Sequence, residues 1–185
     1  MRLLLAATLF ASLCLISMPT GAQGLKAQQR AQELAASFNK SKHETKEKRG
    51  VRIEKFKDIS SVPVSRNDVS FYAGTYVATF GDYPFTIKIN TDGQVVASGS
   101  EPDGQQSARQ FTLREAKLEG ALLTGTKVYA DGTTEKFEGV FINRTERNSP
   151  TDTGRTTFGL GVVFDPPKYE AELGFTLNHI FYQKQ

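Results

Sequence analysis

Apolar and polar residues alternate with a period of two from Ser70 to the end of this 185-residue chain. The clearest stretch, FTIKIN at 85–90, places its apolar side chains on one face of a half-buried strand. Asp92-Gly93 follows it, and Gly accepts the positive φ that a tight hairpin turn requires. The same rhythm predicts about eight strands, at 71–80, 85–89, 94–100, 109–113, 117–130, 134–144, 156–164 and 170–182.

Short turns join these strands, and no helical period intervenes between them. Sequential strands of this kind pair as antiparallel neighbours, so we predict an all-β fold, an up-and-down barrel or a strongly curled sheet. A two-sheet sandwich is the alternative. Asp165-Pro166-Pro167 is expected to break the ladder before the last strand, because proline cannot donate a backbone hydrogen bond.

A different pattern occupies the region before the sheet. Between 23 and 39 the apolar residues fall on one narrow stripe of a 3.6-period helix: Ala27, Ala31, Leu34, Ala35 and Phe38. The next ten residues, KSKHETKEKR, contain nothing apolar, so we predict an amphipathic helix with a charged tail at 23–49 and an extended linker at 50–69. The β-domain then covers 70–185.

The first 22 residues resemble a secretory signal, with Arg2 before an apolar run and a cut expected before Gln23. A periplasmic or secreted protein is therefore expected, with no transmembrane segment in the mature chain. Acylation at Cys14 is the competing interpretation, but Leu13 is bulky for such a site. Removal of the signal removes the only cysteine, which excludes disulfides, thiol nucleophiles and cysteine metal sites.

The opening of the β-region, Phe71-Tyr72-Ala73-Gly74-Thr75-Tyr76, is followed by the Asp92-Gly93 hairpin and a strand ending in Gly99-Ser100-Glu101. This layout resembles the first three strands of calycin barrels, the lipocalins, fatty-acid-binding proteins and avidins. The resemblance implies a barrel of the lipocalin-like kind and carries over no ligand. In those families the first-strand aromatic is usually Trp; this chain has no Trp, and Tyr76 stands in that place.

Composition argues against an enzyme. There are two histidines, and no Gly-x-Ser-x-Gly elbow or glycine-rich phosphate loop occurs. Without a second histidine near His179 no metal-ligand spacing exists, and we expect neither a metal site nor a cofactor. The acid pairs Glu170/Glu172 and Glu101/Asp103 have no third ligand and are expected to be solvated.

Polar side chains inside the barrel are the remaining candidates for ligand binding. His179 shares strand parity with Phe181, which predicts an inward side chain, and Tyr76 and Tyr129 would supply further polar points in an apolar interior. The first functional hypothesis is thus a non-catalytic barrel that binds a small apolar or amphipathic ligand at Tyr76, Tyr129 and His179.

Charge distribution supports the second hypothesis. From 23 to 65 there are ten basic against five acidic residues, whereas from 66 to 185 there are twelve against fifteen. The run that begins at Lys40 and ends at Lys57 would contact an anionic envelope surface or an acidic protein, as in a structural or interaction protein of the cell envelope. Its interleaved acids favour instead a solvated spacer, or a segment folded onto the mildly acidic barrel of its own chain, and we expect no nucleic-acid binding.

Overall fold

The computed structural model describes residues 21–78, 83–102, 108–168 and 177–185. Within these residues, one α-helix and a short 3-10 helix accompany ten strands. The elements, in chain order, are α1 (Gly21–Ser37), β1 (Lys40–Lys48), β2 (Val51–Pro63), η1 (Val69–Tyr72), β3 (Gly74–Ala78), β4 (Pro84–Ile89), β5 (Val95–Pro102), β6 (Ala108–Glu119), β7 (Leu122–Tyr129), β8 (Thr134–Arg147), β9 (Arg155–Lys168) and β10 (Leu177–Lys184).

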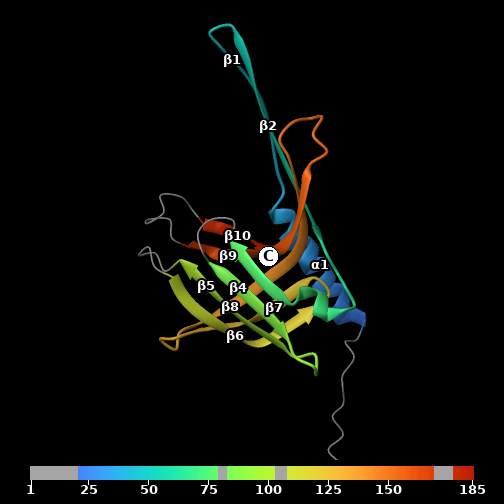
Figure 1. Ribbon diagram of the computed structural model, residues 1–185, viewed down its shortest axis with the longest axis vertical. Coiled ribbons are helices and arrows are strands. Elements are labelled where there is room, and N and C mark those ends of the chain that lie inside the picture. Colours follow the sequence, from blue (N-terminus) through green and yellow to red (C-terminus); the bar gives the residue numbers. More distant parts are fainter. Residues whose placement is uncertain (1–20, 79–82, 103–107, 169–176) are drawn as a thin grey trace, which may run out of the picture.

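Strands β3 to β10 form a closed eight-stranded antiparallel barrel, which confirms the predicted barrel and excludes the sandwich (Figure 1). Each of these strands pairs with its neighbours in sequence. The first strand, β3, also pairs with the last, β10, and this pairing closes the ring. Strand β2 pairs with the outer half of β8, at Asp58–Pro63 against Ile142–Arg147, so the β1–β2 hairpin is attached to the barrel wall.

Several predicted strand boundaries differ in the structure. The first predicted strand begins as a 3-10 turn, and only 74–78 pairs within the sheet. The break predicted after Leu113 is a bulge inside β6, where Glu115 has a positive φ of 53°, and the chain reverses instead at Gly120. Strand β9 extends through Asp165-Pro166-Pro167 to Lys168, although these residues lie in the register gap between β9 and β10.

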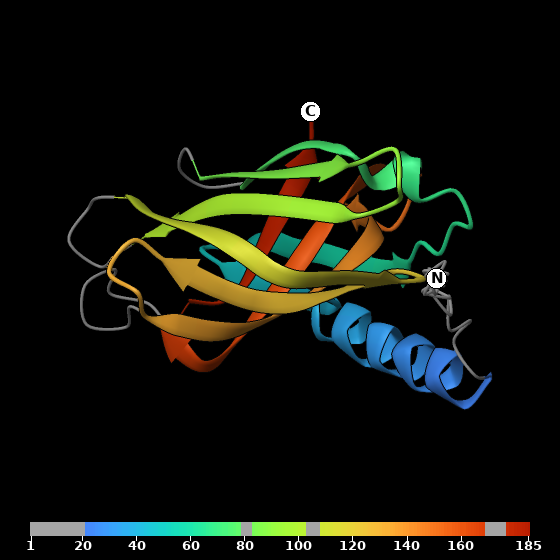
Figure 2. The same ribbon diagram turned by 90° about the horizontal axis from the view of Figure 1, so that it is seen from below.

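Alternating side chains divide into two cores. The barrel interior is filled by a cluster that includes Tyr76, Phe85, Phe141 and Leu160. A second core lies outside the barrel, where α1 packs its alanine-rich stripe against β7, β8 and β10 (Figure 2). The predicted stripe is confirmed, since Phe38 is partly buried and its other four residues are buried. These four are Ala27, Ala31, Leu34 and Ala35.

The charged tail or linker predicted at 40–49 is instead a strand, and the predicted extended segment at 50–69 is extended over 51–63, but as a paired strand and not as a linker. These residues form the two strands β1 and β2, which project from the barrel as a twisted ribbon beside the end of β8 and β9 (Figure 1). Backbone hydrogen bonding to β2, rather than burial of apolar side chains, orders β1, and this contribution is invisible to a hydrophobicity pattern.

Candidate functional site

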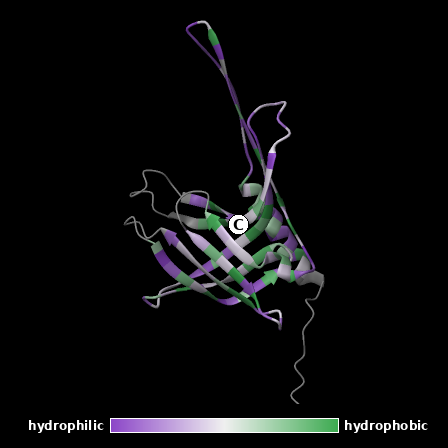
Figure 3. Cartoon of the chain, viewed as in Figure 1, coloured by the Kyte–Doolittle hydropathy of each residue, from purple (hydrophilic) through white to green (hydrophobic). Residues whose placement is uncertain are grey.

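The β1–β2 ribbon is a long, polar hairpin that ends in the turn Arg49-Gly50. Both turn residues have positive φ, 54° and 74°, as a two-residue turn matched to the twist of a hairpin requires. None of the nine residues of β1 is buried. Hydropathy colouring shows the ribbon as largely hydrophilic, with a hydrophobic segment near its tip (Figure 3).

The pairing register sorts the charges of this ribbon onto two sides. Residues directly opposite one another point to the same face, and alternate residues of a strand point to opposite faces. One face, here called the lysine side, carries six lysines and one glutamate: Lys40, Lys42, Lys46, Lys48, Lys55, Lys57 and Glu44. The other face, the acid side, carries three carboxylates and one arginine, together with His43 and Phe56: Glu47, Glu54, Asp58 and Arg52.

Side-chain contacts agree with this assignment. On the lysine side, Glu44 lies 3.2 Å from Lys42 and 3.7 Å from Lys46. A hydrogen bond from Lys42, and then the charges of Lys42, Lys46 and Lys55, lower the pKa of Glu44. On the acid side, the rings of His43 and Phe56 lie 4.2 Å apart. One carboxylate therefore faces six ammonium groups, and the lysine side keeps a strong positive excess.

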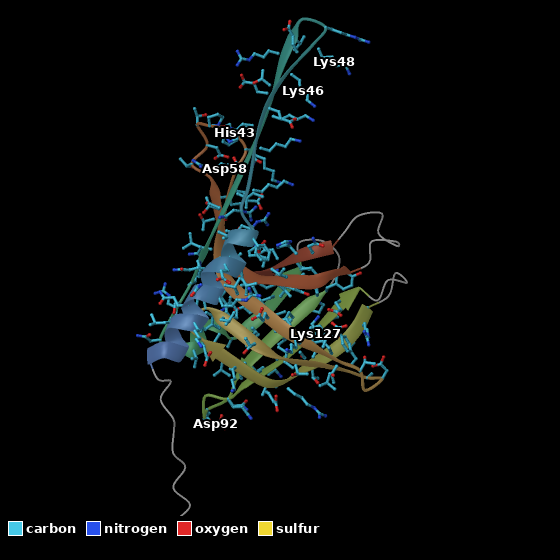
Figure 4. The ribbon with its side chains drawn as sticks, turned by 180° about the vertical axis from the view of Figure 1, so that it is seen from behind. His43, Lys46, Lys48, Asp58, Asp92 and Lys127 are labelled. Carbon is cyan, nitrogen blue, oxygen red and sulfur yellow. The ribbon has the colours of Figure 1, made fainter. Side chains whose placement is uncertain are left out.

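The base of the ribbon is held to the barrel by specific contacts. Asn39 accepts a hydrogen bond from the backbone N–H of Ser61 at 2.7 Å through its side-chain oxygen. Arg147 of β8 pairs with Asp58 on the acid side. These contacts fix the direction in which the ribbon leaves the barrel, and Lys46 and Lys48 lie in its outer part, away from the barrel wall (Figure 4).

A pocket of about 410 Å³ lies where the lysine side meets the barrel. We call it the base pocket; its lining residues come from the end of α1, from β1, β2, β8 and β10: Ser37, Phe38, Asn39, Lys40, Lys57, Ile59, Arg144, His179 and Phe181. Three of these carry positive charge and none is a carboxylate. Lys40 and Lys57 belong to both the lysine side and the base pocket, so the two features are continuous.

The structure places His179 in the base pocket, and its predicted position inside the barrel is wrong. The ring contacts Phe38 edge to face at 5.0 Å, on the outer surface that α1 covers. Partial burial there lowers the pKa of His179. The inward residues of β10 are its sequence neighbours Ile180 and Tyr182, because the pairing with β9 sets the parity opposite to the predicted one.

Tyr76 and Tyr129 do lie inside the barrel. The hydroxyl of Tyr76 donates to the backbone oxygen of Tyr72 at 2.6 Å. The hydroxyl of Tyr129 donates to Glu101 at 2.6 Å, and the same carboxylate pairs with the ammonium of Lys127. The three residues predicted to bind a ligand therefore do not form one site: two are committed to internal hydrogen bonds, and His179 faces outward.

The expectation that Glu101 is solvated is wrong, because its carboxylate lies inside the barrel beside Lys127, and the buried charges of this internal cluster were not predicted from the sequence. Glu101 is fully buried and the Lys127 side chain is 3 % exposed. The ammonium lies 4.8 Å from the ring of Phe111 and 4.9 Å from that of Phe164. Burial, and next the hydrogen bond to Glu101, raise the pKa of Tyr129. A signal was present, because Lys127 shares the strand parity of the inward residues Leu123 and Tyr129.

Aromatic side chains from opposite walls meet across the barrel interior. Phe85 of β4 stacks on Phe137 of β8 at 5.4 Å and lies 5.8 Å from Tyr182 of β10. Beside this filled centre, a pocket of about 1010 Å³ lies between α1 and the wall where β8 and β9 separate, and we call it the side pocket. Lys127, Phe137 and Phe164 line it together with Leu34 of α1.

Within the part of the chain that the structure describes, no helix is long and apolar enough to cross a membrane. The described residues also contain no group of three or more histidine, cysteine or acidic side chains placed to hold a metal ion. Comparison with family models, curated proteins and solved structures finds no match for this chain.

Proposed function

We propose that this protein is a non-catalytic docking protein that attaches its barrel to a bilayer surface rich in anionic lipid through the lysine side of the β1–β2 ribbon. The observation that carries the proposal is the register, which gathers six lysines against one glutamate on one side of a projecting hairpin. Cationic side chains near an anionic bilayer each contribute about 1 kcal/mol to binding. A net excess of five charges thus supplies about 5 kcal/mol at low salt.

Protection of an exposed edge strand is the other role that lysines of β1 would serve. Charged residues keep edge strands from pairing with a second chain. That role needs charge somewhere along the edge, and either sign on either face suffices. It does not require lysines of both strands on one side with carboxylates on the opposite side, which is the arrangement here.

A lipid surface fits this array better than an acidic protein does. Nine residues of strand extend over about 30 Å, so the lysines form a long row and not a compact patch. Val51, which pairs with Lys48 next to the turn, is 60 % exposed and places an apolar group among the cations. A row of cations with an apolar tip suits a bilayer interface, where head groups and acyl chains lie side by side.

The test compares two triple variants in vesicle sedimentation. Lys42, Lys46 and Lys48 are changed to Gln in one variant; in the matched control, three exposed barrel lysines are changed to Gln: Lys88, Lys117 and Lys136. At low salt we expect the ribbon variant to lose about 3 kcal/mol, more than a hundredfold, on vesicles containing phosphatidylglycerol, and the control to lose less than tenfold. Neither protein should bind pure phosphatidylcholine, and salt should weaken all binding.

Equal losses in the two triple variants would contradict the proposal, because net charge and not the ribbon would then decide binding. Wild-type protein that ignores anionic vesicles but binds an acidic polypeptide through the same lysines would also contradict it, in favour of a protein partner. Circular dichroism of each variant checks that the barrel remains folded.

The side pocket supports a second candidate function, the binding of a small amphipathic ligand. Four apolar residues of its lining, Leu34, Phe137, Val162 and Phe164, lie beside the ammonium of Lys127, and charged residues of α1, β6 and β8 complete the lining. Pockets of this size accommodate drug-sized molecules. Native mass spectrometry of the purified protein tests it: a retained mass that disappears when Leu34 is changed to Trp would support the ligand, and an unliganded mass after exposure to fatty acids and detergents would oppose it.

A further inference from the structure

The base pocket gathers three cationic side chains without a carboxylate, unlike the rest of the lysine side. Elsewhere on the lysine side Glu44 lies close to its lysine neighbours, whereas the base pocket holds Lys40, Lys57 and Arg144 with no carboxylate in its lining. Glu146 pairs with Arg144 at 2.7 Å but is not among the lining residues. The lining of the base pocket is therefore cationic without a carboxylate of its own.

The end of α1 reduces this positive excess only in part. A helix C-terminus carries about −0.5 of an elementary charge on its unpaired carbonyls. Here three of those carbonyls accept hydrogen bonds, from the Ser37 hydroxyl at 2.6 Å and from the backbone N–H groups of Phe38 and Asn39 at 3.1 and 3.0 Å. When the half charge of the helix end and the negative charge of Glu146 are counted against Lys40, Lys57 and Arg144, an excess of about 1.5 positive charges remains, which is more than a monoanion neutralises.

Two side chains held by neighbouring groups supply donors to the base pocket, Arg144 and His179. The guanidinium of Arg144 lies 5.2 Å from the ring centre of Phe181. It also pairs with Glu146, two residues further along β8. A guanidinium has five N–H donors, and one carboxylate does not use all of them. His179, lying against Phe38, adds a ring N–H donor beside the cations. Phe38 itself fits closely on β9 because Gly161 has no side chain: an added Cβ would lie 2.8 Å from its ring.

From these features we infer that the base pocket binds a phosphate monoester, the head group of an anionic lipid at the surface to which the ribbon docks. The inference rests on the proposed docking function and adds selectivity to it. A monoester carries a charge of about −1.5 to −2 at neutral pH and three acceptor oxygens, whereas a phosphodiester carries about −1. The lysine side provides general attraction, and the base pocket distinguishes one head group from another.

The test measures vesicle binding of the full-length mature chain on two lipids at equal surface charge, phosphatidic acid and phosphatidylglycerol, each diluted in phosphatidylcholine. Wild-type protein should prefer phosphatidic acid by about tenfold or more, as an additional charge-assisted hydrogen-bond set provides. Arg144→Gln should bring this preference close to one and leave binding to phosphatidylglycerol within about threefold of wild type. Arg155→Gln, an exposed arginine outside the base pocket, is the matched control and should keep the preference.

Two further experiments refine this test. The first distinguishes a lipid head group from a soluble phosphate as the ligand, and the second distinguishes a direct role of Arg144 in binding from a structural role. Glycerol 3-phosphate should compete for phosphatidic acid vesicles only at millimolar concentration if the lipid surface is the source; competition at micromolar concentration identifies a soluble monoester as the ligand and overturns the lipid assignment. Glu146→Gln should preserve or strengthen the preference, because it removes a competing acid, and loss of preference in that variant would show that the ion pair is only structural.

Two negative results have different meanings. If Arg144→Gln weakens both lipids equally, or wild type shows no preference, the base pocket is part of the general positive field and the inference fails while docking stands. If wild-type protein binds neither lipid, the proposed docking function itself fails. The triple ribbon variant described above will then show no loss of vesicle binding relative to wild type.

Discussion

The internal ion pair of the barrel makes a sharp prediction about stability. Glu101 of β5 and Lys127 of β7 pair inside the barrel, and Tyr129 donates a second hydrogen bond to the same carboxylate. Glu101 is fully buried, and the Lys127 side chain is 3 % exposed. Removing one partner therefore leaves an uncompensated charge in an aromatic surrounding.

The expected magnitudes follow from this burial. Breaking a buried ion pair by truncating one partner costs about 3–5 kcal/mol, whereas replacing both partners by apolar residues of similar volume is often neutral or stabilising. We therefore expect Glu101→Met and Lys127→Met each to lower the free energy of unfolding by about 3 kcal/mol or more, and the double variant E101M/K127M to lose less than either single variant. For a domain of this size, 3 kcal/mol corresponds to a Tm decrease of about 6–12 °C.

Urea unfolding of the four proteins, followed by circular dichroism with a common slope, measures the coupling energy of this double-mutant cycle. A coupling of about 2 kcal/mol or more is expected. Losses of the two single variants that simply add in the double variant would refute the reasoning, because each residue would then stabilise the barrel by packing alone. The spectrum of each variant, compared with wild type, checks that the barrel is retained.

Three further predictions address other parts of the fold. Gly159→Ala should destabilise the barrel by about 3 kcal/mol or more in urea, since an added Cβ would overlap the backbone oxygen of Tyr182, and a loss below about 1 kcal/mol would contradict this packing. Leu34→Ala should cost about 2 kcal/mol and loosen α1, with faster amide exchange in the helix; unchanged exchange would show that the helix does not depend on this contact. Burial and the Glu101 contact raise the pKa of Tyr129, so stability should fall as pH rises above about 10, where the unfolded tyrosine ionises first, and Tyr129→Phe should reduce that loss.

The fold was predictable from the sequence to a large extent because its signal is local. Alternation of side chains from residue 70 onward indicated eight antiparallel strands, and the closed barrel confirms this number and this type of pairing. The alanine-rich stripe of α1 was equally visible. The lipocalin-like resemblance, the secretory signal and the periplasmic or secreted location stay predictions; the signal, at 1–22, lies almost wholly outside the described residues, as do Glu170 and Glu172.

The ribbon was not predictable from its own residues. A stretch without apolar side chains has no hydrophobic period, and only the turn at Arg49-Gly50 together with the anchoring of β2 to β8 brings 40–48 into a sheet. The error at His179 has a related cause. Counting parity from Phe181 was correct, but the choice of which parity faces inward depends on the pairing of β10 with β9 and β3.

The sequence by itself determined the strand rhythm, the apolar stripe of the helix, the absence of cysteine from the predicted mature chain and the excess of positive charge near the N-terminus. Only the tertiary structure decided which face of each strand lies inside, that Glu101 and Lys127 meet in the interior, and that the charges of the β1–β2 ribbon separate onto two sides. The physical reason is that a period of two defines the two faces of a single strand, whereas long-range hydrogen-bond register determines which faces are brought together and which of them is covered.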